Sequence, residues 1–225
     1  MTQPSDNSAQ NVPGQDTPAP NIPPQYLRAA EAPAPRTLLD VLRATTERYP
    51  EAPAIDDGHG IVTYSELLAE VTETAETLAA QGIRRGDRLG IRMPSGQRSL
   101  YIAILSTIAA GAAYVPVDAD DPEERAELVF GEADVQGIFT ADGLQLSTPA
   151  EELRRRENTL TGPDLDTDAW IIFTSGSTGK PKGVAVSNRS AAAFVDAEAE
   201  MFLQAEPLGP EDRVLAGLSV AFDAS

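Results

Sequence analysis

The chain has 225 residues, 35 acidic and 17 basic side chains, no Cys and a formal net charge of −18. Without thiols it has no disulfides, no Cys-ligated zinc or iron–sulfur site and no cysteine nucleophile, and a single His leaves little for a metal cluster. Because the negative charge repels polyanions, we expect no nucleic-acid partner and no membrane partner.

The first 36 residues hold eight of the 18 prolines and one aromatic side chain, Tyr26. Such a composition buries too little apolar area to offset the entropy lost on ordering. We therefore expect residues 1–36 to form a disordered, Pro-rich tail or linker. The segment has neither the charged nor the apolar region of a secretory signal, so a cytoplasmic location is the default expectation.

Two helix starts follow the tail. The Thr37–Asp40 segment resembles a capping box and predicts a helix that stops at Pro50. The Thr63–Glu66 segment repeats this signature after a short strand, and its apolar helix face continues to Gly82.

An uncharged run from Leu100 to Val117 meets the bare length rule for a membrane span. Its internal Ser, Thr, Gly and Pro residues favour a different reading. We expect a buried helix ending at Gly111 and then an inner strand, Ala113–Val117, closed by the polar Asp118.

The remaining pattern alternates strands and helices. The expected strands are Asp87–Met93, Val135–Thr140, Ala169–Thr174 and Arg213–Leu218, and the expected helices are Pro122–Ala133 and Asn188–Leu203. Residues 141–167 show no apolar periodicity, and we interpret the Arg154–Arg156 run there as a solvated face. Such alternation predicts an α/β fold with helices layered on mainly parallel sheets, and ligands in these sheets bind beyond the carboxyl ends of strands.

Residues 174–183 read TSGSTGKPKG and contain both lysines of the chain. Glycines let backbone amides approach an anion, hydroxyls add donors, and lysines supply point charges. The glycine spacing and the Pro after Lys180 differ from a Walker A loop. A flexible Gly/Ser linker would explain the glycines but neither the lysine pair nor the strand before them. The loop therefore favours phosphate binding.

The segment Phe173–Gly183 closely resembles the signature loop of the adenylate-forming enzymes, which include acyl-CoA synthetases, luciferases and the adenylation domains of nonribosomal peptide synthetases. Val62–Leu67, Ala110–Asp118 and Phe222–Ser225 resemble the first, second and fourth core motifs of this family. The resemblance covers about residues 37–225. It implies a truncated, N-terminal part of an AMP-binding adenylation domain, and a fold that is part of the large N-terminal subdomain.

The resemblance implies that the signature loop holds the β and γ phosphates of ATP. A substrate carboxylate then attacks the α-phosphorus to give an acyl-AMP and pyrophosphate, with Mg²⁺ neutralising charge. The nucleotide-binding residues it implies here are Thr174, Ser175, Gly176, Ser177, Thr178, Gly179, Lys180 and Lys182.

The fourth motif bears on the substrate. In relatives that activate amino acids its Asp pairs with the α-ammonium group, and the matching residue is Asp223, with Ala224 lining the side-chain pocket. Fatty-acid and aryl-acid relatives generally lack this Asp. A further position departs from the peptide-synthetase pattern, since Asn188 stands where those relatives often have His.

The resemblance also implies what lies outside the chain. The residues that stack on adenine, hold the ribose, ligate Mg²⁺ and supply the catalytic lysine all follow residue 225 in the family, so no catalytic or metal-binding residue is assigned. The expected partners are an amino acid, the missing C-terminal part and a carrier domain bearing phosphopantetheine. We expect residues 1–225 alone to be inactive and poorly soluble. The alternatives are a non-catalytic nucleotide-binding remnant and part of an acyl-CoA or aryl-acid ligase.

Overall fold

A computed structural model describes residues 33–174, 181–201 and 208–221. Almost all of the expected tail, residues 1–36, therefore lies outside the described residues. From Ala34 onward the described residues belong to one compact unit.

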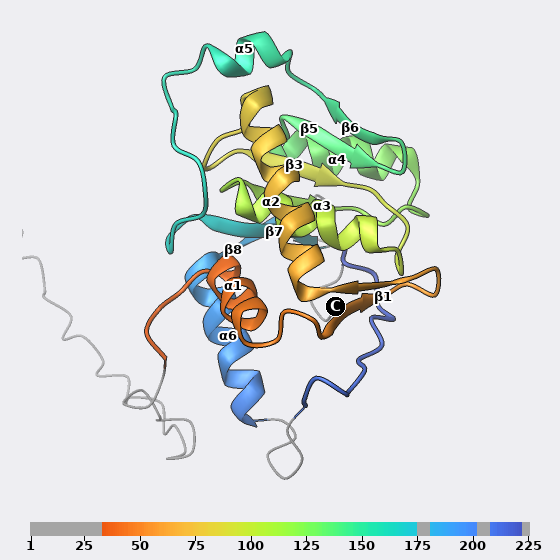
Figure 1. The fold of residues 1–225 in the computed structure, drawn as a ribbon. Helices are drawn as coiled ribbons and strands as arrows, with labels where there is room; N and C mark the ends of the chain where they lie inside the picture. Colours follow the sequence, from red (N-terminus) through yellow and green to blue (C-terminus); the bar gives the residue numbers. More distant parts are fainter. Residues whose placement is uncertain (1–32, 175–180, 202–207, 222–225) are drawn as a thin grey trace, which may run out of the picture. The chain divides into compact units, whose positions relative to one another are not determined.

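The unit is built on a six-stranded sheet in the order β6-β5-β3-β4-β7-β8 (Figure 1). The central pairs β3–β4, β3–β5 and β4–β7 are parallel, whereas the outer strands β6 and β8 are antiparallel to their neighbours. The prediction of a mainly parallel α/β sheet is confirmed. The strands are β3 (Arg88–Ile91), β4 (Ala113–Pro116), β5 (Gly137–Thr140), β6 (Gly143–Leu146), β7 (Asp168–Thr174) and β8 (Lys182–Ser187).

Helices cover both faces of this sheet. On one face, α2 (Tyr64–Gln81) and α3 (Arg98–Ala109) pack against Leu89 and Ile91 of β3, both fully buried. On the other face, α4 (Glu123–Ala133) packs against Val115 of β4. In β4, Tyr114 packs against the first core and Val115 belongs to the second, as expected for a parallel strand covered on both sides. Phe139 and Ile138 of β5 are divided between the two cores in the same way. Within the described residues no helix is long and apolar enough to cross a membrane.

Both predicted capping boxes are confirmed. In α1 (Leu38–Arg48) the Asp40 amide donates to the Thr37 hydroxyl at 3.2 Å, and the Asp40 carboxylate accepts from the Thr37 amide at 2.9 Å. Thr63 and Glu66 make the same exchange at the start of α2. That helix ends at Gly82, whose φ of +104° and close approach to α5 (Ala150–Arg154) both require glycine.

A two-stranded antiparallel sheet, β1 (Pro53–Asp56) and β2 (Ile61–Thr63), joins α1 to α2. The expected strand before the second capping box is therefore present, although its partner β1 was not predicted. Leu42 of α1 and Val62 of β2 are buried in a small cluster with α2.

The polar segment 141–167 contains two elements that the sequence pattern did not predict, β6 and α5. The interpretation of its Arg run as a solvated face is wrong for Arg156. This guanidinium donates to both oxygens of Asp87 at 2.6 Å and to the Gly82 carbonyl at 2.7 Å. Because Asp87 is buried, it requires a positive partner, and its hydrogen bonds raise the pKa of Arg156.

The C-terminal part of the described chain differs most from expectation. The predicted strand Arg213–Leu218 is wrong, because these residues pair with no strand of the described chain, and the side chain of Leu215 is 92% exposed. By contrast, β8 occupies a segment for which no strand was predicted. The following helix, α6 (Asn188–Met201), agrees with the predicted helix over the described residues.

Candidate phosphate-binding site

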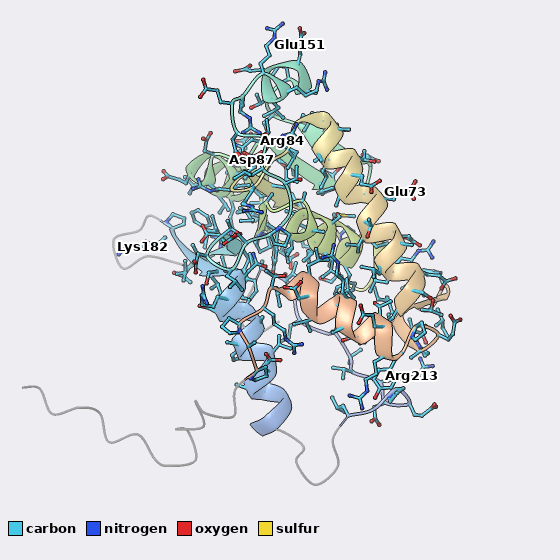
Figure 2. The ribbon with its side chains drawn as sticks, turned by 60° about the vertical axis from the view of Figure 1, so that its left-hand side comes forward. Glu73, Arg84, Asp87, Glu151, Lys182 and Arg213 are labelled. Carbon is cyan, nitrogen blue, oxygen red and sulfur yellow. The ribbon has the colours of Figure 1, made fainter. Side chains whose placement is uncertain are left out.

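The candidate site lies where β7 ends and β8 begins. Thr174 is the last residue of β7, Lys182 is the first of β8, and the two are directly opposite in the antiparallel ladder. Directly opposite residues project from the same face of a sheet, so the Thr174 and Lys182 side chains leave neighbouring positions on one face. Both residues are exposed, and Figure 2 shows Lys182 at the margin of the molecule.

Lys182 forms no ion pair within the part of the chain that the structure describes. Another cation at the carboxyl edge of the sheet, Arg92 after β3, is engaged instead by Glu123 and by the Asp121 carbonyl. The Thr174–Lys182 pair therefore supplies a hydroxyl donor and a positive charge at one strand end.

The other predicted site residues lie outside the described residues. They are Ser175, Gly176, Ser177, Thr178, Gly179, Lys180, Asp223 and Ala224. Of the predicted set, the structure thus brings together Thr174 and Lys182.

Sequence reasoning gave no role to a polar pair at the end of β4. The nearby Ser219 hydroxyl and the Asp120 amide, which donates to Asp118 at 2.9 Å, lower the pKa of the Asp118 carboxyl. Tyr114 of β4 is in register with Trp170 of β7, so the parallel strands carry Asp118 to the same carboxyl edge as Thr174. The position of Asp118 immediately after an inner strand is the sequence signal that points to it.

The contact with Asp118 fixes the path of the C-terminal segment. Ser219 lies at the carboxyl edge of β4, and the side chain of the next residue, Val220, packs against the core formed by α2, α3 and β3. The segment that leads to Asp223 is therefore attached to the edge of the sheet that carries Thr174.

Asn188, which stands where peptide-synthetase relatives often have His, lies buried at the start of α6. Its side chain is 1% exposed, and its amide donates to the Thr167 carbonyl at 3.2 Å, at the end of β7–β8 away from the candidate site. Its Oδ1 has no hydrogen-bond partner among the described residues. The neighbouring Arg189 pairs with Asp166. These contacts attach the start of α6 to the turn before β7.

The donor set fits the phosphate groups of a nucleotide, because an ammonium and a hydroxyl stabilise anionic oxygens. Across the residues that the structure describes, no three His, Asp or Glu side chains gather as a metal site. No residue is therefore assigned to Mg²⁺.

Comparison with known proteins identifies the family. Residues 42–225 match the family model described as AMP-binding enzyme. The chain belongs to this family. The resemblance of its signature loop is thereby confirmed.

Two similar proteins illustrate the relationship. Phenyloxazoline synthase MbtB of Mycolicibacterium paratuberculosis is 32% identical over 93% of this chain and 19% of its own length. The probable non-canonical nonribosomal peptide synthetase CymA of Salinispora arenicola is 34% identical over 85% of this chain and 3% of its own length. The chain thus spans a fifth or less of these relatives.

Solved structures agree with the fold. The nonribosomal peptide synthetase FmoA3 is 30% identical, with a TM-score of 0.69 over 86% of this chain and 21% of that one. The N-terminal subdomain of Klebsiella oxytoca NpsA, in complex with 3-hydroxyanthranilyl-AMSN, is 27% identical, with a TM-score of 0.57 over 68% of this chain and 41% of that one. The expected fold, part of the N-terminal subdomain of an adenylate-forming enzyme, is confirmed.

Proposed function

We propose that this chain forms part of an adenylation domain that activates an amino acid as its aminoacyl-AMP, with ATP as the second substrate. The observation that carries the proposal is the Thr174–Lys182 pair, which sets a hydroxyl and an ammonium opposite each other at the carboxyl end of β7. Membership of the AMP-binding family and similarity to peptide synthetases support it.

The chemistry follows from these two groups. The substrate carboxylate attacks the α-phosphorus of ATP, a new phosphoryl bond to the carboxylate oxygen forms, and the bond to pyrophosphate breaks. Negative charge grows on the departing pyrophosphate, where the Lys182 ammonium and the Thr174 hydroxyl stabilise it. Mg²⁺ bound to ATP supplies further positive charge.

The remaining site residues belong to the proposal. Ser175, Ser177, Thr178 and Lys180 would add donors to the phosphates, while Gly176 and Gly179 would let backbone amides approach them. Asp223 would pair with the α-ammonium of the amino acid, next to Ala224 in the side-chain pocket. A carboxylate desolvated in this way binds an amine and disfavours acids that lack one.

The proposed partners follow from the same reading. Residues 1–36 would act as a linker, and residues 37–225 would supply the N-terminal part of the domain. A partner segment would supply the catalytic lysine, and a phosphopantetheine thiol on a carrier domain would accept the aminoacyl group. We propose a cytoplasmic location for this chemistry.

A second substrate class has specific support. The NpsA subdomain was solved with 3-hydroxyanthranilyl- and 3-hydroxybenzoyl-AMSN, whereas FmoA3 was solved with α-methyl-L-serine-AMP. An aryl-acid ligase is therefore the alternative enzyme, and a nucleotide-binding remnant without turnover is the alternative without catalysis.

The test is exchange of labelled pyrophosphate into ATP by the natural full-length protein, with a panel of amino acids and aryl acids. We expect exchange with one or a few amino acids, and its loss in Asp223→Ala. Exchange only with aryl acids, unaffected by Asp223→Ala, would favour the alternative enzyme. Nucleotide binding without exchange would favour the remnant. Residues 1–225 alone are expected to give no exchange.

A further inference from the structure

We propose that Phe173 and Gly183 form a positioning pair that sets the register of β8 on β7 and thereby places the Lys182 ammonium beside the Thr174 hydroxyl. The inference rests on the proposed role of these two groups in binding ATP. It assigns a function to two residues of the signature segment that make no polar side-chain contact of their own.

The first observation is the shape of the pair. Phe173 and Gly183 are directly opposite in the ladder, and a Cβ added to Gly183 would lie 3.0 Å from the Phe173 ring and 2.9 Å from Cγ2 of Ile171. The ring therefore occupies the space that a side chain at Gly183 would need. An aromatic ring packed over a glycine on an edge strand is a recognised device for fixing register.

The second observation is that burial does little to hold β8. Among the described strands it is an edge strand with one neighbour, its first four residues are exposed, and the side chain of Val184 is 52% exposed. Register is strongly specified where one face of a strand is buried, and weakly specified otherwise. A local steric device is therefore needed at this edge.

The third observation is an irregularity in the ladder. Asp168 pairs with Ser187 at the far end, and the register shifts before Trp170 pairs with Val186. If the far register continued unchanged, Phe173 would face Lys182 instead of Gly183. The contacts of Asn188 at the far end thus do not determine the register at the candidate site.

A one-residue slip has a direct chemical consequence. Side chains alternate between the faces of a strand, so Lys182 would move to the face of Phe173, away from the Thr174 hydroxyl. The phosphate groups would then lose one of two adjacent donors. Phe173 and Gly183 act through Lys182, so they are positioning residues.

The test uses Gly183→Ala in the natural full-length protein, with pyrophosphate exchange as the activity. We expect KM for MgATP to rise roughly tenfold while KM for the amino acid is unchanged, because the added methyl group overpacks the contact. Mere loss of folded protein would lower the maximal rate and leave both KM values unchanged. Ala185→Ser, which adds one heavy atom at an exposed position of the same strand, is the matched control and should change neither KM.

Rescue makes the test specific. Phe173→Leu replaces the aromatic ring with a smaller aliphatic side chain, which leaves room for the methyl group of Gly183→Ala. The double variant should therefore recover most of the MgATP affinity lost in the single variant. If Gly183→Ala leaves KM for MgATP unchanged, or if the double variant is weaker than Gly183→Ala, the positioning pair is refuted.

Hydrogen–deuterium exchange separates this inference from the proposed function. Amides of residues 182–187 should be protected in the wild-type protein, exchange faster in Gly183→Ala, and regain protection in the double variant. Equal exchange in all three refutes the positioning pair whatever the activity. Protection that follows this pattern, in a protein without any pyrophosphate exchange, supports the pair and refutes the proposed function.

Discussion

The centre of the sheet and its β7–β8 margin are built in different ways. In the centre, Leu89, Ile91 and Val115 are fully buried between two layers of helices. At the margin, the first four residues of β8 are exposed, and single contacts such as Phe173 over Gly183 replace a buried face. The candidate donors Thr174 and Lys182 both lie at the margin, apart from the buried centre that stabilises the fold.

The largest expected effect is a loss of activity when Lys182, at the β7–β8 margin, is substituted. Lys182→Ala should reduce pyrophosphate exchange by about 100-fold, because a charged donor to the leaving group is lost. Since the residue is exposed, the free energy of unfolding in urea should change by less than about 0.5 kcal/mol. Val184→Ala, on the same strand, is the control and should retain activity. A large loss of stability in Lys182→Ala would contradict the separation of the two regions.

A cavity in the centre of the sheet should instead lower the free energy of unfolding. Leu89→Ala removes a buried side chain between α2, α3 and the sheet, and should lower the unfolding free energy by about 3 kcal/mol. Urea denaturation followed by circular dichroism measures it. Val184→Ala again serves as the control, with a loss of less than about 0.5 kcal/mol. Equal losses for the two variants would show that the margin is packed as firmly as the centre.

Two ion pairs, one with a buried carboxylate and one exposed, allow a further comparison of stability. Asp87→Ala leaves the Arg156 guanidinium without its partner beside the buried end of α2, so we expect a loss of about 2 kcal/mol in unfolding free energy. Glu151→Ala breaks the exposed pair with Arg155 on α5 and should cost less than about 0.5 kcal/mol. The prediction fails if the two substitutions have the same cost.

The smallest expected effect concerns the first capping box. Hydrogen bonds from the Thr37 amide and hydroxyl lower the pKa of Asp40 below its ordinary value of 3.8. The unfolded chain therefore takes up this proton at higher pH than the folded chain. The resulting stability is complete above the ordinary pKa and is lost as pH falls through the lowered value.

Thr37→Ala tests this contribution, with an expected loss of about 1 kcal/mol in unfolding free energy at neutral pH. Asp40→Asn should flatten the acid limb of the stability profile, because the substituted residue no longer titrates. Denaturant unfolding between about pH 5 and pH 2 measures both effects. An unchanged acid limb in Asp40→Asn would show that other carboxyl groups dominate it.

The sequence alone determined the elements whose signals are local. Both capping boxes, the glycine at the end of α2 and the helix–strand reading of the uncharged run follow from neighbouring residues. The signature segment Phe173–Gly183 likewise indicated the family, because glycines, hydroxyls and lysines at fixed spacing act through short-range geometry.

Only the tertiary structure decided the long-range pairings. The sequence pattern predicted a strand at Arg213–Leu218, but a β strand requires a backbone partner, and no described strand pairs with these residues. It read Arg156 as solvated, because nothing local reveals that Asp87 is buried 69 residues away. It also missed β8 and the Asp118–Ser219 contact. In each case the deciding energy comes from a distant partner, and that partner is known only once the chain has folded.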